Sequence, residues 1–412
     1  MKGSTVRFCK KALNLIMAFS INWTDFPEAW DSENELSKVK IIPQLPNYSD
    51  FVKKDSNHIF IQGDNYPCLS VLTKEFSSKV DFIYIDPPYN TGKSFTYNDN
   101  FSGAEDSHSV WLSFMERRLK LAKELLKESG CIFIAIGTEE LYVLKLLCDK
   151  IYGEENFVND FMWLVGKGKK DTWSRTLEQH TLCFAKNKKY LKPFCQIEYS
   201  NWAKSNADGD PRGNWFSGSI SFSENRSNKK HKNFYRITSP GGVVWERQWL
   251  VSKEEMDKLL QEDKIYFGKA PKYDGVPRAK IFNDSENYII PKNIIDFVET
   301  TKQAQNYVDS LLGQKNVFDN PKPVSLIKHF IQISQMPKDA VILDFFAGSG
   351  TTFEAVCQLN NEDSGDRHCI LIQKDEKTSK TTNFDTISKL SFARCQKVQE
   401  IYNEPIEFFE QC

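Results

Sequence analysis

Short apolar runs alternate with helical patterns in the first third of the chain. Residues 58–64, 80–86 and 131–136 form compact apolar runs that predict buried strands. Residues 109–129 carry apolar side chains at spacings of three and four, which predicts an amphipathic helix, and Gly130 is expected to end it. Strands that alternate with helices in this way predict a parallel sheet of the α/β class.

The alternation breaks after about residue 156 and resumes at Pro323. Residues 157–290 are richer in glycine, serine, asparagine, lysine and aromatic residues, and contain only short strand-like pieces. Beyond Pro323, a helix, a strand at 340–346, a helix at 351–359 and a strand at 369–373 restore the pattern. The predicted organisation is an N-terminal extension (1–50), half of an α/β domain (51–156), an insert (157–300) and the other half of that domain (301–412).

The distribution of charge changes the interpretation of the insert. The chain has a formal net charge of −1, yet between Phe161 and Leu250 it carries 16 lysines and arginines against 7 acidic residues. A basic block within a near-neutral protein is typical of a surface that contacts nucleic-acid phosphates. The alternative is a solvated charged surface, which the interleaved aromatic residues disfavour. The candidate contacts are Lys229, Lys230, Lys232 and Arg247.

The cysteines and the N-terminal residues bear on location. Ten cysteines are scattered singly, without a Cys-x-x-Cys pair, which predicts neither a metal site nor a disulfide framework and suits the reducing cytoplasm. Basic residues precede an apolar stretch at 12–21, which is a weak secretory-signal pattern. No clear cleavage site follows, and the stretch is too short to span a membrane. An N-terminal helix, or a start extended upstream of Met17, is expected instead.

The tetrapeptide Asp86-Pro87-Pro88-Tyr89 follows an apolar run at the expected end of a strand. An acidic side chain and a proline carbonyl can together accept both hydrogens of an exocyclic amine, while an aromatic ring can stack on the heterocycle. The prolines fix φ and offer no competing backbone N–H. Open α/β sheets bind ligands at the carboxyl ends of their strands. Taken alone, the tetrapeptide is explained about equally well as a simple strand exit.

A second motif lies far downstream, in the run Asp344-Phe345-Phe346-Ala347-Gly348-Ser349-Gly350-Thr351-Thr352. It predicts a strand, a glycine turn and a helix whose first N–H groups point into the turn. Such a turn can cradle a charged cofactor. It is not a phosphate-binding P-loop, because no lysine follows the second glycine, and it lacks the third glycine of a dinucleotide fingerprint.

Together the two motifs resemble the paired signature of DNA methyltransferases that use S-adenosyl-L-methionine to methylate exocyclic amines. The catalytic motif comes first, as in the β-group of adenine-N6 methyltransferases. The resemblance implies a Rossmann-like methyltransferase sheet with a circularly permuted motif order and an inserted target-recognition domain. Further stretches are similar to modification subunits of type III restriction–modification systems: Gly63-Asp64-Asn65, Asn90-Thr91-Gly92-Lys93, Tyr97-Asn98-Asp99-Asn100-Phe101, Asn320-Pro321-Lys322-Pro323 and Cys369-Ile370-Leu371-Ile372-Gln373.

This resemblance implies catalytic roles for the tetrapeptide. Asp86 and the Pro87 carbonyl would each accept one N6 hydrogen, which localises the nitrogen lone pair and stabilises the positive charge that develops during transfer. Pro88 would help to hold these acceptors still. Tyr89 would stack on the target base, which must leave the duplex to be reached.

The resemblance also implies a set of cofactor contacts. Asp344 would lie near the amino group of the cofactor, and Lys322 would help to close the pocket. Gln373, or Glu376 nearby, would bind the ribose hydroxyls. Asp64 would contact the cofactor adenine, unless it is a plain turn aspartate. The methionine portion would be wrapped by the residues of the turn: Phe346, Ala347, Gly348, Ser349, Gly350 and Thr351.

The expected function is therefore site-specific methylation of adenine N6 in DNA, as the modification component of a restriction–modification system. The implied partners are double-stranded DNA, a restriction subunit with nuclease and helicase activity, and a second copy of the chain. The chain is shorter than type III modification subunits usually are. The alternatives are transfer to cytosine N4, RNA adenine or a protein glutamine, and a DNA-binding specificity subunit that has lost catalysis.

Overall fold

The computed structural model describes residues 21–53, 57–92, 96, 99, 101, 106–166, 173–198, 208–282, 287–378 and 382–412. The apolar stretch before residue 21 and the motif residues Lys93, Tyr97, Asn98 and Asn100 lie outside the described residues. The chain forms two compact units. One unit comprises Met1–Phe194 and Pro291–Cys412, and the other comprises Cys195–Ile290.

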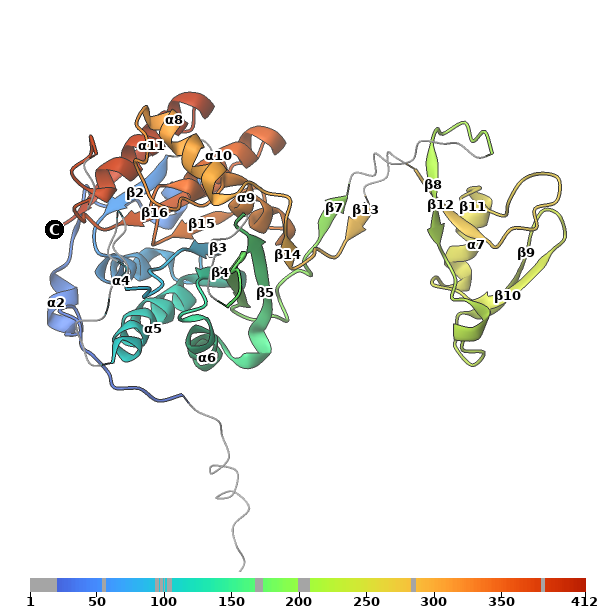
Figure 1. Ribbon diagram of the computed structural model, residues 1–412, viewed down its shortest axis with the longest axis horizontal. Coiled ribbons are helices and arrows are strands. Elements are labelled where there is room, and N and C mark those ends of the chain that lie inside the picture. The colour runs from blue at the N-terminus through green and yellow to red at the C-terminus, as the bar shows by residue number, and fades with distance from the viewer. Residues whose placement is uncertain are drawn as a thin grey trace, which may run out of the picture. The chain divides into compact units, whose positions relative to one another are not determined.

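The first unit is built on a ten-stranded sheet with a parallel centre (Figure 1). The six strands from β17 to β4 run parallel to one another, which confirms the predicted α/β class. Antiparallel pairs flank them at both ends. In sheet order the strands are β1 (Ile41–Ile42), β17 (Ile406–Gln411), β2 (His58–Gln62), β16 (His368–Gln373), β15 (Val341–Asp344), β3 (Val80–Ile85), β4 (Leu126–Ile136), β6 (Glu178–Ala185), β5 (Phe157–Leu164) and β14 (Ile294–Ile295).

Helices cover both faces of this sheet (Figure 1). Successive strand side chains point to opposite faces, so Ile83 and Ile85 pack into one apolar core while Phe82 and Tyr84 pack into the other. Helices α4 (Asn65–Phe76), α5 (Ser107–Leu125) and α6 (Leu141–Tyr152) supply the first core. The second layer holds α8 (Thr301–Leu312), α9 (Val324–Ile333), α10 (Thr351–Asp363) and α11 (Ile387–Tyr402). Short helices α2 (Glu33–Lys38), α3 (Tyr48–Phe51) and η1 (Glu154–Asn156) complete the unit.

The order of the strands creates a switch point at the centre of the sheet. From β3 the chain passes through α5 to β4 on one side, whereas from β15 it passes through α10 to β16 on the other. Strands β3 and β15 are hydrogen-bonded neighbours, with Leu343 opposite Ile83. A crevice forms at the carboxyl ends of two strands whose connections diverge in this way, and both predicted motifs lie there.

One predicted helix boundary was wrong. Helix α5 ends at Leu125, and Leu126 is already extended and begins β4. Gly130 therefore lies within a strand and does not cap the helix. A side chain at Gly130 would place its Cβ 2.9 Å from the Asp81 carbonyl oxygen of the neighbouring strand. The glycine permits a close approach of two strands, beside a register shift between Val80 and Phe82.

The second unit is smaller than the insert expected from the sequence. Strands β5 and β6, assigned to residues 157–300 by the sequence, belong to the large sheet, and the compact unit spans only Cys195–Ile290. The polar residues in these strands suggested an insert. However, the side chains of Phe161 and Trp163 on β5 pack into one core of the large sheet, and Phe184 on β6 packs into the other. The large sheet thus includes β5, β6 and β14 from the range that the sequence assigned to the insert.

Within the second unit, a short helix and residues of two small sheets contribute to a core centred on Trp249 and Met256, and the unit also contains a third small sheet. The buried ammonium of Lys280 pairs with Asp208, Asp210 and Asp263. The elements are β8 (Trp215–Ser219), β12 (Arg278–Phe282) and β11 (Ile265–Tyr266) in one sheet, β9 (Phe234–Thr238) with β10 (Val244–Gln248), β7 (Gln196–Glu198) with β13 (Asn287–Ile289), η2 (Glu224–Arg226) and α7 (Lys253–Gln261). No helix in the described part of the chain is long and apolar enough to cross a membrane.

His329 makes the first unit sensitive to acid. It lies on α9, 6% exposed, with its ring edge against Phe297 at 4.9 Å between centroids. Burial lowers its pKa to about 4. The unfolded chain therefore binds a proton at His329 more tightly than the folded chain does. As a result, the free energy of unfolding is not reduced by this residue above about pH 6.5 and falls as the pH drops from 6.5 towards 4.

We therefore expect His329→Gln to reduce the loss of stability between pH 7 and pH 5. The contribution of this residue over that window is about 2 kcal/mol. Urea unfolding of both proteins at the two pH values measures the difference. An equal loss in the wild-type protein and the variant would contradict the assignment.

Candidate functional site

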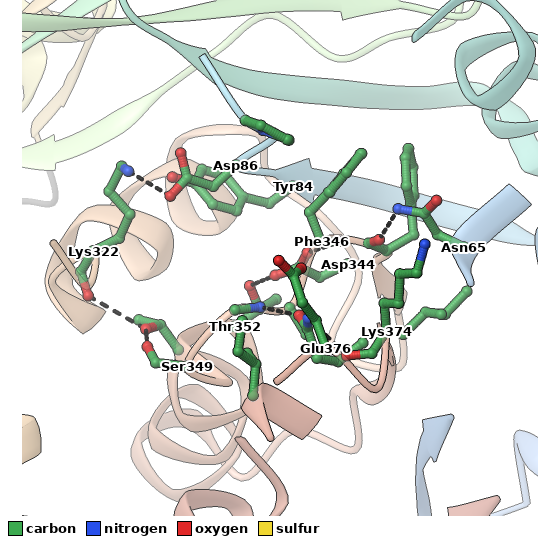
Figure 2. Close-up of a pocket in the computed structure, with 18 of the residues that line it drawn as sticks. Asn65, Tyr84, Asp86, Lys322, Asp344, Phe346, Ser349, Thr352, Lys374 and Glu376 are labelled. Atoms are coloured by element: carbon green, nitrogen blue, oxygen red, sulfur yellow. Dashed lines mark hydrogen bonds and ion pairs between the residues drawn. The ribbon is translucent and has the colours of Figure 1, made fainter. Parts of the chain in front are cut away.

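A pocket of about 230 Å³ lies over the carboxyl ends of β3 and β15 (Figure 2). The structure thus brings together two motifs that are separated by most of the chain. Asp86 and Lys322 lie towards one end of the pocket, and Asn65 and Lys374 towards the other. The predicted residues that line it are Asp64, Asp86, Pro88, Lys322, Asp344, Phe346, Ala347, Gly348, Ser349, Thr351 and Gln373. Pro87, Tyr89 and Gly350 belong to the same loops but are not among the lining residues.

The Asp86 carboxylate is held by two donors. The Tyr89 hydroxyl donates to Oδ1 at 2.7 Å, and the Lys322 ammonium donates to Oδ2 at 2.5 Å. The Lys322 side chain is only 6% exposed, and its nitrogen also lies 5.5 Å from the centre of the Tyr89 ring. The residue predicted to close the cofactor pocket therefore makes an ion pair with the predicted catalytic carboxylate.

The outer part of the same loop is fixed by Trp111 and Asp99. The buried Trp111 indole donates to the Pro88 carbonyl at 2.7 Å. The Asp99 carboxylate accepts the backbone N–H groups of Tyr89, Asn90 and Thr91. Among the described residues, none donates to the Pro87 carbonyl. The two proline carbonyls thus differ: the Pro88 carbonyl anchors the loop to Trp111, whereas the Pro87 carbonyl is available to accept a hydrogen bond from a ligand.

The glycine turn has the backbone geometry that its sequence predicts. Gly348 and Gly350 have φ values of 53° and 79°, which glycine adopts readily. A Cβ on Gly350 would lie 3.0 Å from the Cys395 sulfur. Helix α10 begins at Thr351 without a side-chain cap, so the N–H groups of its first turn remain available at the turn.

Asp344 ends β15 beneath this turn and is buried, with 3% of its surface exposed. Its carboxylate accepts the Phe346 N–H at 3.0 Å and the Thr352 hydroxyl at 2.5 Å. Burial raises the pKa of Asp344 to about 7, and although its two hydrogen bonds oppose this, the charge of nearby Asp86 adds to it. The site therefore contains a carboxyl group that changes charge near neutral pH.

Arg394 supports the turn and was missed by the sequence analysis. This fully buried residue of α11 donates to the Ser349 carbonyl and hydroxyl and to the Thr351 hydroxyl. It also pairs with Glu354 at 2.8 Å, and neither side chain of the pair is exposed. The only sequence signal was a charged residue on the apolar face of the helix, which local patterns do not connect to a turn 45 residues earlier.

The opposite end of the pocket is a network of charged groups. Asp64 caps α4 by accepting the Tyr66 N–H and pairs with Arg118 and Lys374. Burial acts to raise the pKa of Asp64, but these two cations hold it below its usual value. Asn65, in the same motif, donates to the Phe345 carbonyl at 2.8 Å and ties the two halves of the domain together.

Two polar groups of the pocket differ in their hydrogen bonding: the Gln373 side-chain oxygen is paired, whereas the Tyr84 hydroxyl is not paired with any described residue. The Gln373 side-chain oxygen accepts the Gly348 N–H at 2.8 Å, so this amide is occupied in shaping the turn. Tyr84 lines the pocket, and its buried hydroxyl has no hydrogen-bond partner among the described residues. An unpartnered buried hydroxyl costs about 1–3 kcal/mol, which a ligand in the pocket can offset. From the sequence, Tyr84 was predicted only to be a strand residue.

The predicted DNA contacts lie on the second unit. Lys229, Lys230 and Lys232 are exposed together just before β9. Arg247, on β10, is instead mostly buried and pairs with Glu224 at 3.2 Å. The lysines thus form a cationic surface, which we call the lysine turn, whereas Arg247 is engaged within the unit.

A family model described as "DNA methylase" matches residues 80–384. The match begins at β3, continues through both motifs of the pocket and covers most of the chain. The chain belongs to the DNA methylase family. Membership confirms the resemblance predicted from the two motifs, and it agrees with the α/β sheet described above.

Individual relatives of this DNA methylase come from type III and type II systems. It is 34% identical to the StyLTI Mod subunit of a type III restriction–modification enzyme from Salmonella typhimurium, over 93% of this chain and 63% of that protein. It is 32% identical to the EcoPI Mod subunit from Escherichia phage P1, over 94% and 68%. Identity to the type II methyltransferase M.KpnI from Klebsiella pneumoniae is 32%, over 87% and 91%. The chain thus spans about two thirds of the length of the two Mod subunits.

Proposed function

We propose that this chain methylates adenine N6 in double-stranded DNA, with S-adenosyl-L-methionine as methyl donor, as the modification component of a restriction–modification system. The observation that carries the proposal is the meeting of Asp86 and the glycine turn at one pocket. The names of the relatives support the substrate and the kind of system. A restriction subunit is the partner that the names of the Mod subunits suggest, and a second copy of the chain is a further proposed partner.

The pocket suits a cofactor that carries both charged and apolar groups. Asp344 would bind the amino group, and the uncapped N-terminus of α10 would bind the carboxylate. Glu376 lines the pocket and, because the Gln373 amide is occupied by the turn, would bind the ribose hydroxyls. The unpartnered Tyr84 hydroxyl would gain a partner. Bound S-adenosyl-L-methionine would supply an activated methyl group at the Asp86 end.

The loop at residues 86–89 would prepare the amine for attack. Asp86 and the Pro87 carbonyl would accept the two N6 hydrogens of a flipped-out adenine. Each carboxylate oxygen has two acceptor positions, so Asp86 can accept an amine hydrogen while Lys322 and Tyr89 hold it. These two donors hold the carboxylate in place before the amine arrives, which is electrostatic preorganisation. The excess proton would leave to water.

The proposal predicts that Asp86→Ala abolishes methyl transfer but retains the cofactor. Loss of the acceptor and of its charge should lower the rate by about 10³-fold or more, while calorimetry should give a dissociation constant for S-adenosyl-L-methionine within about threefold of wild type. Asp50→Ala, at an exposed aspartate of α3, is the control.

The assay follows labelled methyl groups into unmethylated DNA, with nucleoside analysis of the product. N6-methyladenine that disappears in Asp86→Ala supports the proposal. N4-methylcytosine as the product would replace adenine by cytosine as the target. Normal turnover by the variant would remove Asp86 from the mechanism, and cofactor binding without any transfer by the wild-type protein would indicate a subunit that has lost catalysis.

A second prediction concerns pH. Because the pKa of Asp344 is raised to about 7, the carboxyl is largely protonated below neutrality and must ionise to bind a cationic amino group. The affinity for S-adenosyl-L-methionine should therefore rise with pH up to about 7, by at most about tenfold per pH unit. Calorimetry in buffers of different ionisation enthalpy would detect the released proton. Asp344→Asn should bind more weakly, with a flat profile, and an unchanged slope in that variant would contradict the role.

A third prediction concerns the lysine turn. Replacing Lys229, Lys230 and Lys232 with glutamine should weaken DNA binding and flatten its dependence on salt, by about 0.9 in the logarithmic slope for each phosphate that is no longer neutralised. Fluorescence anisotropy at several salt concentrations measures both effects. Lys258→Gln, at an exposed lysine of α7, is the matched control. A salt slope equal to that of wild type would place the DNA-binding surface elsewhere.

A further inference from the structure

Glu140 is a buried carboxylate that the proposed chemistry does not use. It lies between the end of β4 and the start of α6 and has no exposed surface. One carboxylate oxygen accepts the Asn90 side-chain amide at 2.6 Å and the His108 ring nitrogen at 2.7 Å. The other oxygen is buried without a partner among the described residues. Burial raises the pKa of Glu140.

The position of Glu140 is not explained by its own helix. It is the N-cap residue of α6, yet its side chain makes no capping hydrogen bond. Glutamate is not among the favoured N-cap residues, which use a short side chain to accept a first-turn N–H. A buried carboxylate with one unpaired oxygen is also costly for stability. The side chain is instead directed at the loop that follows Tyr89.

Asn90 connects Glu140 to the proposed catalytic loop. It directly follows Tyr89 and has a φ of 58°, in the left-handed region that asparagine tolerates better than most residues. Its backbone N–H is held by Asp99, while its side chain is held by Glu140. Gly137, at the end of β4, lies against the Tyr89 ring, since a Cβ there would be 2.9 Å from the ring. Tyr89 is thus followed by a residue anchored on both its backbone and its side chain.

We propose that Glu140 is a positioning residue, which holds Asn90 and through it aims Tyr89 at the target base. The inference rests on the proposed function and on the stacking of Tyr89 on that base, which the resemblance to DNA methyltransferases implies. Neither Glu140 nor Asn90 lines the cofactor pocket, so this role is separable from cofactor binding. His108, whose side chain is 61% exposed, contacts the same oxygen from the solvent side.

The test compares Glu140→Ala, Asn90→Ala and the double variant in methyl transfer. Each single change should lower kcat about 10- to 100-fold, as expected when a reacting group is misplaced by about 1 Å. The double variant should be no slower than the slower single variant, because each change breaks the same hydrogen bond between Asn90 and Glu140. The dissociation constant for S-adenosyl-L-methionine should stay within about twofold. Glu140→Gln should recover much of the rate, since its amide oxygen can still accept from Asn90.

Amide hydrogen exchange supplies a readout that does not need activity. Residues 86–92 should exchange faster in Glu140→Ala and in Asn90→Ala than in the wild-type protein, whereas exchange in α10 should be unchanged. Glu154→Gln, at an exposed glutamate beyond the far end of α6, is the control. Asn90→Ala keeps Glu140 in place. It therefore provides the exchange measurement at residues 86–92 if Glu140→Ala does not fold.

The outcomes separate this inference from the proposed function. Unchanged exchange at residues 86–92 in the variants, or effects on kcat that multiply in the double variant, would overturn the positioning role. A parallel loss of cofactor affinity would show a general structural role and also overturn it. Absence of methyl transfer by the wild-type protein would count against the proposed function, while the exchange data would still decide whether Glu140 holds the loop.

Discussion

The pairing of β3 with β15 is the interaction on which this site depends. It places Ile83 opposite Leu343, and the loops that leave these strands then share one edge of the sheet. The same pairing brings Asp86 and Asp344 near each other, so two carboxylates lie at one pocket. Lys322 reduces the resulting repulsion through its ion pair with Asp86, and it also acts to lower the raised pKa of Asp344. A change in this pairing would therefore alter the shape and the charge of the site together.

Carboxylates also organise the periphery of the site. Asp99 and Glu140 hold the segment after Tyr89, and Asp64 joins Arg118 to Lys374 at the far end. These groups accept N–H donors that the loops would otherwise leave unsatisfied. The loops have an irregular backbone, but they are held by many hydrogen bonds. These hydrogen bonds allow a loop to present acceptors such as Asp86 and the Pro87 carbonyl at fixed positions.

The sequence predicted the parallel sheet and the two motifs that meet at the pocket, because both motifs combine local backbone geometry with distinctive chemistry. Other lining residues, such as Phe114, Arg118 and Phe318, were not predicted. The sequence also did not predict partners that are distant in the chain. Arg394 and Trp111 act through contacts with residues distant in the chain, which leave no local pattern. The insert was drawn too wide because β5 and β6 pair directly as antiparallel strands, and the described residues between them contain no helix like those that marked the other strands. The helix end near Gly130 was misplaced because glycine serves close packing as well as helix termination.

The two ends of the second unit are joined to each other before the chain returns to the large sheet. Strand β7 pairs with β13, with Gln196 opposite Ile289, so the entering and leaving segments run side by side. The unit also has a core of its own, centred on Trp249 and Met256. Because the two junctions lie side by side in space, recombination at both of them can replace the unit between them. The central sheet would then keep its register. The two units can then diversify at different evolutionary rates within one chain.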